Sequence, residues 1–165
     1  MELNFLAILV AAIVPLFIGF IWYGPMLFQN AWMREAGMTE EKMKSSNMAV
    51  IFLVSLLLSV LLAFFTQFLV IHQVGAMGMV GGDPTDALPS FQAFMDDYGN
   101  SYRTFKHGAL HGGLAGVFLI LPVLATQAMF ERKSFKYVAI NAGYWIITIA
   151  IMGGIVCQWG TDFNV

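Results

Sequence analysis

Charged side chains are scarce in this chain, and cysteine is almost absent. Asp, Glu, Lys and Arg make up 11% of the 165 residues, whereas soluble domains carry roughly 25%. The net charge is −2, so the sequence offers no basic surface for nucleic acid. The single cysteine, Cys157, excludes an internal disulfide and a metal site built from several thiolates. We find no nucleophile with its base, no phosphate loop and no dinucleotide motif, and we do not expect an enzyme.

Apolar residues, in contrast, are abundant. They make up 59% of the chain, and the mean hydropathy is +0.74. A chain of this length has too small an interior to bury so much apolar surface, so much of it must face lipid. A helix needs about 20 apolar residues to cross a bilayer, and four stretches meet this length: residues 3–23, 48–74, 108–130 and 137–159. Because backbone groups in lipid must bond within their own segment, we predict an all-α integral membrane protein. Residues 1–165 form a single membrane domain, a bundle of four transmembrane helices.

Two loops carry amphipathic patterns of their own. Residues 25–36 begin with a proline and place their apolar side chains on one helical face (Leu27, Phe28, Ala31 and Trp32). Residues 90–98 repeat the pattern at helical spacing (Phe91, Phe94, Met95 and Tyr98) and are followed by a glycine. We therefore predict short interfacial helices in the first and second loops.

The basic residues predict the orientation in the membrane. Six of the eight Lys and Arg residues fall in the first and third loops (Arg34, Lys42, Lys44, Arg132, Lys133 and Lys136). Loops rich in Lys and Arg stay in the cytoplasm. We therefore expect a multi-pass protein with both termini on the outer side.

Small residues predict how the helices pack. Gly108, Gly112 and Gly116 form a doubled Gly-x-x-x-Gly pattern in the third span, and Ser55 and Ser59 share this spacing in the second. Small residues let helix backbones approach closely in lipid, either within a subunit or between subunits. Four helices enclose little space, so we expect a homo-oligomer. The expected partners are the lipid bilayer, further copies of the chain and other membrane proteins.

All three histidines fall at the outer ends of the second and third spans. His107 and His111 are four residues apart on one helical face, and His72 ends the second span. Neutral imidazoles together with a carboxylate bind transition metals such as zinc, copper or nickel. Alternatively, these residues line an entrance for protons or solutes together with Gln67, or simply form hydrogen bonds to neighbouring helices and headgroups. Because the pair has no adjacent glutamate, the sequence favours the hydrogen-bonded interpretation and predicts no resident cofactor.

The cytoplasmic half of the chain contains few polar groups. Asn141 and Gln127 lie at the same level, so we predict that they hydrogen-bond between the third and fourth spans. No acid is paired with a base deep in any span. A proton-coupled pump needs such groups, so their absence argues against one.

Several sequence segments resemble a known family. They are Trp22-Tyr23-Gly24-Pro25, Ala31-Trp32-Met33, Gly37-Met38-Thr39, Phe130-Glu131-Arg132-Lys133-Ser134 and Ile140-Asn141-Ala142-Gly143-Tyr144-Trp145. Together they resemble the bacterial membrane family DUF1761, a domain of unknown function, over nearly the whole chain. The resemblance implies a small four-helix protein of the bacterial cytoplasmic membrane, and it implies no activity.

Three functions remain open from the sequence. The favoured one is a structural or accessory membrane component, for which we expect a sealed bundle with hydrogen-bonded histidines. The second is a small channel or transporter subunit acting as an oligomer, which requires a polar cavity reaching the middle of the membrane. The third is a metal-binding site at the outer ends of the second and third spans, which requires convergent imidazole nitrogens.

Overall fold

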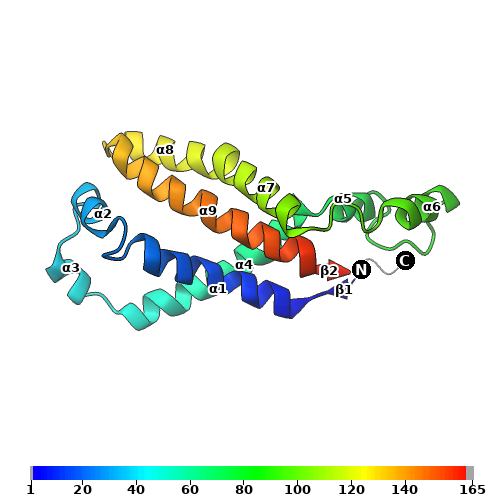
Figure 1. Ribbon diagram of the computed structural model, residues 1–165, viewed down its shortest axis with the longest axis horizontal. Helices are drawn as coiled ribbons and strands as arrows, with labels where there is room; N and C mark the ends of the chain where they lie inside the picture. Colours follow the sequence, from blue (N-terminus) through cyan, green and yellow to red (C-terminus); the bar gives the residue numbers. More distant parts are fainter. Residues whose placement is uncertain (1, 163–165) are drawn as a thin grey trace.

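The chain folds into a long bundle of four helices, shown in Figure 1. The computed structural model describes residues 2–162, with the side chain of Asp162 excepted. Four helical segments are long and apolar enough to cross a membrane: Phe5–Trp22, Met48–Val70, Phe105–Phe130 and Phe135–Trp159. The prediction of an all-α membrane protein with four spanning helices is confirmed. The second span is shorter than predicted because its helix ends at Val70, and the third begins three residues earlier than predicted.

The spanning helices are α1 (Phe5–Trp22), α4 (Met48–Val70) and α9 (Phe135–Trp159), together with a third, composite segment. That segment consists of α7 (Phe105–Ala115), a π-helical stretch η1 (Gly116–Ile120) and α8 (Leu121–Phe130). The N-caps of the spanning segments are polar side chains that accept a backbone N–H, namely Asn4, Asn47, Thr104 and Ser134. These caps satisfy backbone donors that have no partner within the helix.

Shorter elements lie at the two ends of the bundle. The first loop forms α2 (Gln29–Ala36) and α3 (Glu40–Lys44), and the second forms α5 (His72–Met79) and α6 (Pro89–Tyr98). Helix α2 begins four residues later than the predicted 25–36, whereas α6 matches 90–98 closely. Figure 1 shows α5 and α6 projecting beyond the end of the bundle where the described termini lie. There, β1 (Glu2–Leu3) pairs antiparallel with β2 (Thr161–Asp162).

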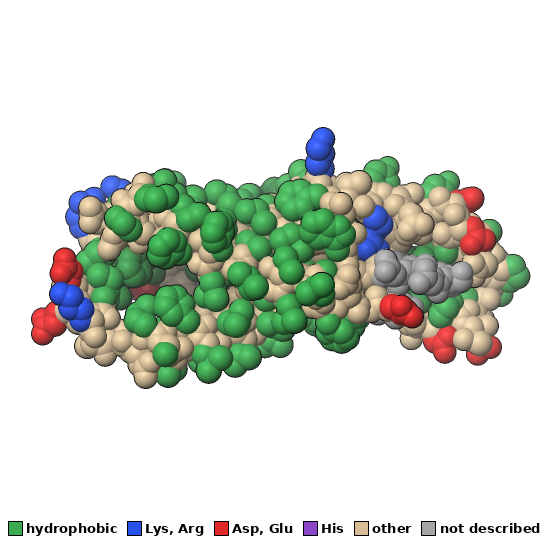
Figure 2. All heavy atoms as spheres, turned by 60° about the horizontal axis from the view of Figure 1, so that its bottom comes forward, with side chains coloured by type: hydrophobic (Ala, Val, Ile, Leu, Met, Phe, Trp, Pro, Cys, Tyr) green, Lys and Arg blue, Asp and Glu red, His purple; other side chains and the backbone are tan. Residues whose placement is uncertain are grey.

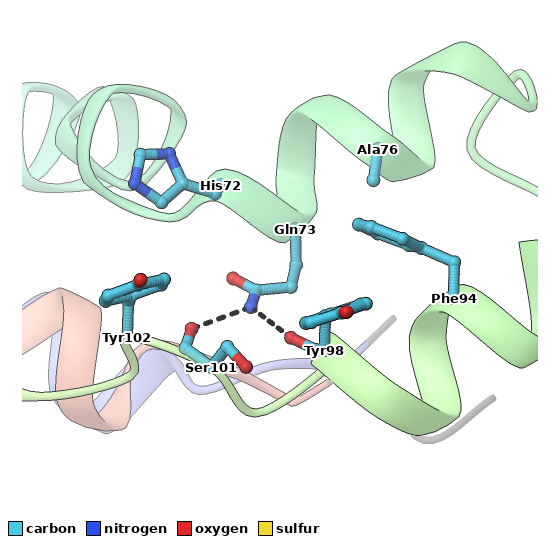
Figure 3. Close-up of a pocket in the computed structure, with 7 residues that line it drawn as sticks. All are labelled: His72, Gln73, Ala76, Phe94, Tyr98, Ser101 and Tyr102. Atoms are coloured by element: carbon cyan, nitrogen blue, oxygen red, sulfur yellow. Dashed lines mark hydrogen bonds between the residues drawn. The ribbon is translucent and has the colours of Figure 1, made fainter.

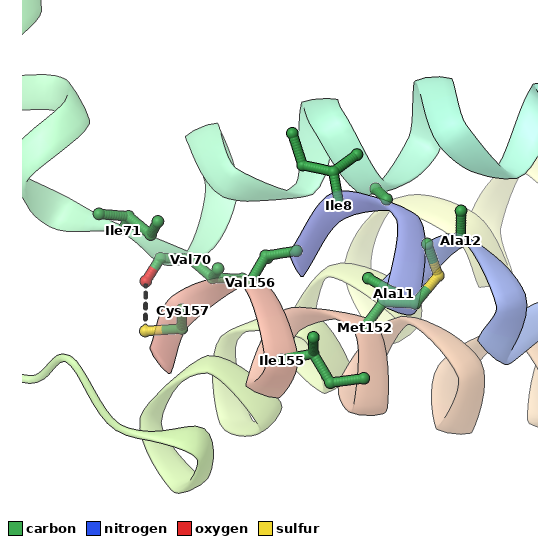
Figure 4. Close-up of a cluster of buried hydrophobic side chains, with 10 residues drawn as sticks. Ile8, Ala11, Ala12, Val70, Ile71, Met152, Ile155, Val156 and Cys157 are labelled. Atoms are coloured by element: carbon green, nitrogen blue, oxygen red, sulfur yellow. Dashed lines mark hydrogen bonds between the residues drawn. The ribbon is translucent and has the colours of Figure 1, made fainter. Parts of the chain in front are cut away.

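Helix α9 is the centre of the bundle. In its most apolar window 61% of the residues are buried, compared with 11–28% in the other three spans. Its Met152, Val156 and Cys157 pack against Ala11 of α1 and Val70 of α4, as Figure 4 shows. Many apolar side chains of the spanning helices are exposed, and on the face seen in Figure 2 they cover most of the bundle while charged side chains gather toward its ends. This distribution is the one required of helices that face lipid.

Glycines let α7 lie directly against α9. A Cβ added to Gly108 would be 2.2 Å from the carbonyl oxygen of Gly153, and one added to Gly112 would be 2.3 Å from that of Ile149. Gly116 is similarly close to Ile146, at 2.7 Å from its Cα. Ser59 instead donates to the carbonyl of Ser55 in its own helix. The glycine face of α7 is thus occupied by α9 of the same chain.

Candidate metal centre

The three histidines meet at the end of the bundle where β1 and β2 pair. One ring nitrogen from each of His72, His107 and His111 can be chosen so that all three atoms lie within 4.8 Å of one another. The Nε2 atoms of His72 and His107 are 2.9 Å apart, which is a hydrogen bond when one ring donates and the other accepts. His72 is exposed, and the other two are half-buried.

Helix α7 supplies two of the rings. Thr104 caps this helix, and its hydroxyl oxygen accepts the backbone N–H of His107 at 3.3 Å. The i, i+4 spacing then puts the rings of His107 and His111 at a centroid distance of 4.4 Å. The contact of Gly108 and Gly112 with α9 fixes the rotation of α7 about its axis. The rotation in turn fixes where the two histidines sit.

A break in the helix supplies the third ring. Ile71 separates α4 from α5 with an extended backbone (φ −109°, ψ 106°), and its side chain is buried in the core. The α-helix is interrupted there, and His72 becomes the first residue of α5. Its ring centroid lies 4.9 Å from that of His107 and 5.0 Å from that of His111. A continuous helix through Ile71 would have carried His72 to a different position.

The spacing of the nitrogens is near that of a metal site. Zinc–imidazole bonds of roughly 2.0–2.1 Å put two ligands of a tetrahedral ion roughly 3.3 Å apart. The 2.9 Å pair must open slightly, and the separations of up to 4.8 Å must close by about 1.5 Å, which side-chain rotation can provide. The group contains no carboxylate. Three neutral imidazoles would leave the fourth position of a tetrahedral ion to water or an added ligand.

Tyr102 lies beside the cluster, and no sequence pattern marks it as a site residue. Its ring centroid is 5.0 Å from that of His107 and 6.4 Å from that of His72. Its backbone is left-handed, with φ of 62°, which is unfavourable for a bulky residue and recurs at functional sites. A glycine or asparagine at this position would have signalled such a conformation, but a tyrosine does not.

Gln67 does not join the histidines. Its side chain is buried, and its Oε1 accepts a hydrogen bond from the hydroxyl of Thr161 in β2. The entrance expected from Gln67 and His111 stays a prediction. Gln67 instead ties the end of α4 to the strand that follows α9.

Asn141 and Gln127 do not bond to each other, contrary to the prediction. The Asn141 Oδ1 accepts from the Tyr23 hydroxyl at 2.9 Å, and its Nδ2 donates to the Tyr137 carbonyl. The Gln127 Nε2 donates to Glu131 at 2.8 Å. Asn141 has this different partner because α1 ends beside α9. Tyr23, the residue that follows α1, therefore lies within hydrogen-bond distance of the Asn141 amide. The contact joins α1 to α9.

A groove of about 700 Å³ lies between α1, α4 and α9 and is visible as a hollow in Figure 2. Its walls include Ser59, Tyr23 and Tyr144, but their hydroxyl groups already bond to protein. Tyr144 donates to the Pro15 carbonyl at 2.9 Å, and Ser59 donates to Ser55. The lining of the groove is therefore mostly apolar.

Comparison with known proteins identifies a family but no individual related protein or structure. The sequence model described as "Protein of unknown function (DUF1761)" matches residues 6–157, nearly the whole chain. No curated protein matches the chain significantly, and no solved structure does.

Proposed function

Because this chain belongs to the DUF1761 family, which is described only as of unknown function, we propose its function from the geometry of the site. The protein binds one divalent transition-metal ion, with Zn²⁺ as the reference ion, at the outer end of its bundle. His72, His107 and His111 are the ligands. The observation that carries this proposal is the convergence of ring nitrogens from two helices to within 4.8 Å.

The participation of His111 separates this proposal from a purely structural role. A hydrogen bond between His72 and His107 uses two rings and would satisfy a packing role. The ring centroid of His111 lies within 5.0 Å of the centroids of both other rings, so all three histidines of the chain form one cluster. Histidines that only pack against neighbours need not gather in this way. A His₃ set with an open fourth position is a known arrangement for zinc.

The orientation that we propose puts this site outside the cytoplasm. The six basic residues of the first and third loops lie at the opposite end of the spanning helices from the histidines. The protein would then hold its metal ion at the outer face of the cytoplasmic membrane. In this role it is an accessory membrane component that stores, presents or senses a metal ion.

Zinc titration of the purified protein tests the proposal. The protein is placed in lipid nanodiscs, stripped with a chelator and titrated against a competing zinc indicator, with Cu²⁺ in a parallel series. We expect one high-affinity ion per chain, and each of His72→Ala, His107→Ala and His111→Ala should weaken binding by at least about tenfold.

The matched control is Asp97→Asn, which removes an exposed carboxylate of α6 at the same end of the molecule. It should bind zinc as the unaltered protein does. Equal binding by the triple histidine variant, or no stoichiometric zinc in the unaltered protein, would exclude the site. His107→Gln keeps a polar side chain, and its circular dichroism shows whether any loss reflects unfolding.

A further inference from the structure

A second site lies between α5 and α6, beyond the end of the bundle. A cavity of about 230 Å³ is lined on one side by His72, Gln73 and Ala76 of α5 and on the other by Phe94 and Tyr98 of α6 and the turn after it. Figure 3 shows these residues. The spanning helices alone are long enough to cross the hydrocarbon, since 23 residues of α4 rise about 34 Å. The cavity is therefore expected to open to water rather than to lipid.

Gln73 connects the two sides of this cavity through hydrogen bonds. Its side chain is 5% exposed, and its Nε2 donates to the carbonyl oxygens of Tyr98 at 3.0 Å and Ser101 at 2.9 Å. These two bonds hold the turn after α6 against α5. They also fix the orientation of the amide, because a flipped amide would put its oxygen against two carbonyl oxygens.

The oxygen of this amide has no partner. Gln73 Oε1 is buried and forms no hydrogen bond with any described residue. In Figure 3 it points toward the space between His72 and Tyr102. Buried acceptors are almost always satisfied, and one that is not requires an explanation. A donor supplied by a bound molecule or by water would satisfy it.

The rest of the cavity surface is mostly apolar. The rings of Phe94 and Tyr98 face Ala76 across it in Figure 3. No Lys or Arg is among the lining residues, so an anion would have no counter-charge. A cavity of about 150 Å³ accommodates benzene, so this one has room for an aromatic ring with a short substituent.

We infer that this cavity binds a small, mostly apolar molecule that carries one hydroxyl or amino group. The N–H or O–H of the ligand donates to Gln73 Oε1, and its hydrocarbon part lies against Phe94 and Tyr98. The hydrophobic effect favours its transfer from water. This site does not require a bound metal, because His72 is the one residue that it shares with the histidine cluster.

Two fluorinated probes that differ in a single hydroxyl group test the inference. 4-Fluorobenzyl alcohol and 4-fluorotoluene are titrated separately onto the nanodisc protein by ¹⁹F NMR, with a chelator present throughout. We expect the alcohol to bind at least about fivefold more tightly, which is the effect of one hydrogen bond to an otherwise unsatisfied acceptor. The Gln73→Met variant keeps the length of the side chain and should abolish this preference.

The variant Ala76→Leu fills the cavity without touching the hydrogen bonds of Gln73, and it should abolish specific binding of both probes. Its matched control on the same helix is Gly78→Leu, because a Cβ at Gly78 meets no atom within 4 Å. Binding of the probes that is the same in Ala76→Leu as in the unaltered protein overturns the site. An alcohol preference that survives Gln73→Met overturns the role of Gln73. Alcohol binding in a protein that fails to bind zinc would leave this inference standing while the proposed function falls.

Discussion

Gly108 and Gly153 approach so closely that neither has room for a side chain. A Cβ on Gly108 would lie 2.2 Å from the Gly153 carbonyl oxygen, and a Cβ on Gly153 would lie 2.5 Å from that of Gly108. Both obstacles are backbone atoms, which cannot rotate away. The position of α7, and with it of His107 and His111, depends on this contact.

We therefore predict that Gly108→Ala destabilises the protein by about 1–3 kcal/mol, the usual cost of overpacking. Gly113→Ala is the matched control. Its new Cβ would meet the Ala150 Cβ at an ordinary 3.8 Å, and alanine favours the helix. In detergent, the thermal unfolding midpoint of Gly113→Ala should be equal to or higher than that of the unaltered protein. The midpoint of Gly108→Ala should be well below it. An equal midpoint for the two variants would contradict the packing described here.

The hydrogen bond between Tyr23 and Asn141 predicts a measurable coupling. Tyr23→Phe and Asn141→Leu each remove one side of the 2.9 Å contact between α1 and α9. In a double-mutant cycle we expect a coupling free energy of about 0.6 kcal/mol, with a maximum of about 1.7 kcal/mol, as for other hydrogen bonds in membranes. Additive effects within experimental error would mean that the bond does not form.

The backbone of Tyr102 predicts an unusual response to glycine. At a φ of 62°, glycine is unstrained whereas alanine is not, so Tyr102→Gly should be more stable than Tyr102→Ala by about 1 kcal/mol. The same pair of substitutions at Tyr98, the last residue of α6, should give the reverse order. Chemical unfolding of the four variants compares the two sites. If Tyr102→Ala were more stable than Tyr102→Gly, the backbone at position 102 would not be left-handed.

Cysteine labelling tests the orientation of the chain. Cys157 is 1% exposed, so a maleimide should not modify it in the folded protein from either side. A cysteine in place of exposed Ser90 in α6 should react with an impermeant maleimide in intact cells, and one in place of exposed Ser45 should react only after permeabilisation. The opposite result would place both termini in the cytoplasm.

The arrangement of the helices was largely predictable from the sequence, because the apolar stretches are long and nearly free of charge. The histidine cluster was partly predictable. His107 and His111 follow from helical spacing alone, but His72 reaches them only because the helix breaks at Ile71, where neither glycine nor proline marks a break.

The partners of buried polar groups were not predictable. Asn141 was expected to pair across to Gln127, and it pairs with Tyr23 of a helix that is distant in sequence. Depth along a span can be counted from sequence, but the rotation of each helix about its axis cannot. The cavity around Gln73 escaped prediction for a similar reason. It depends on how the turn after α6 folds back onto α5, and no periodicity records that path.

The contact between His72 and His107 joins positions that are 35 residues apart, and the intervening chain includes nearly all of α5 and the whole of α6. A metal ion shared by these two rings would act as a cross-link that closes this loop. Closing a loop of such length with a covalent bond removes conformational entropy from the unfolded chain worth roughly 3–4 kcal/mol, and a metal ion would supply a similar restraint only while it is bound. Metal occupancy would then set how firmly the segment that contains α5 and α6 is held. A molecule bound within that segment and the metal ion would each raise the other's affinity by the same factor.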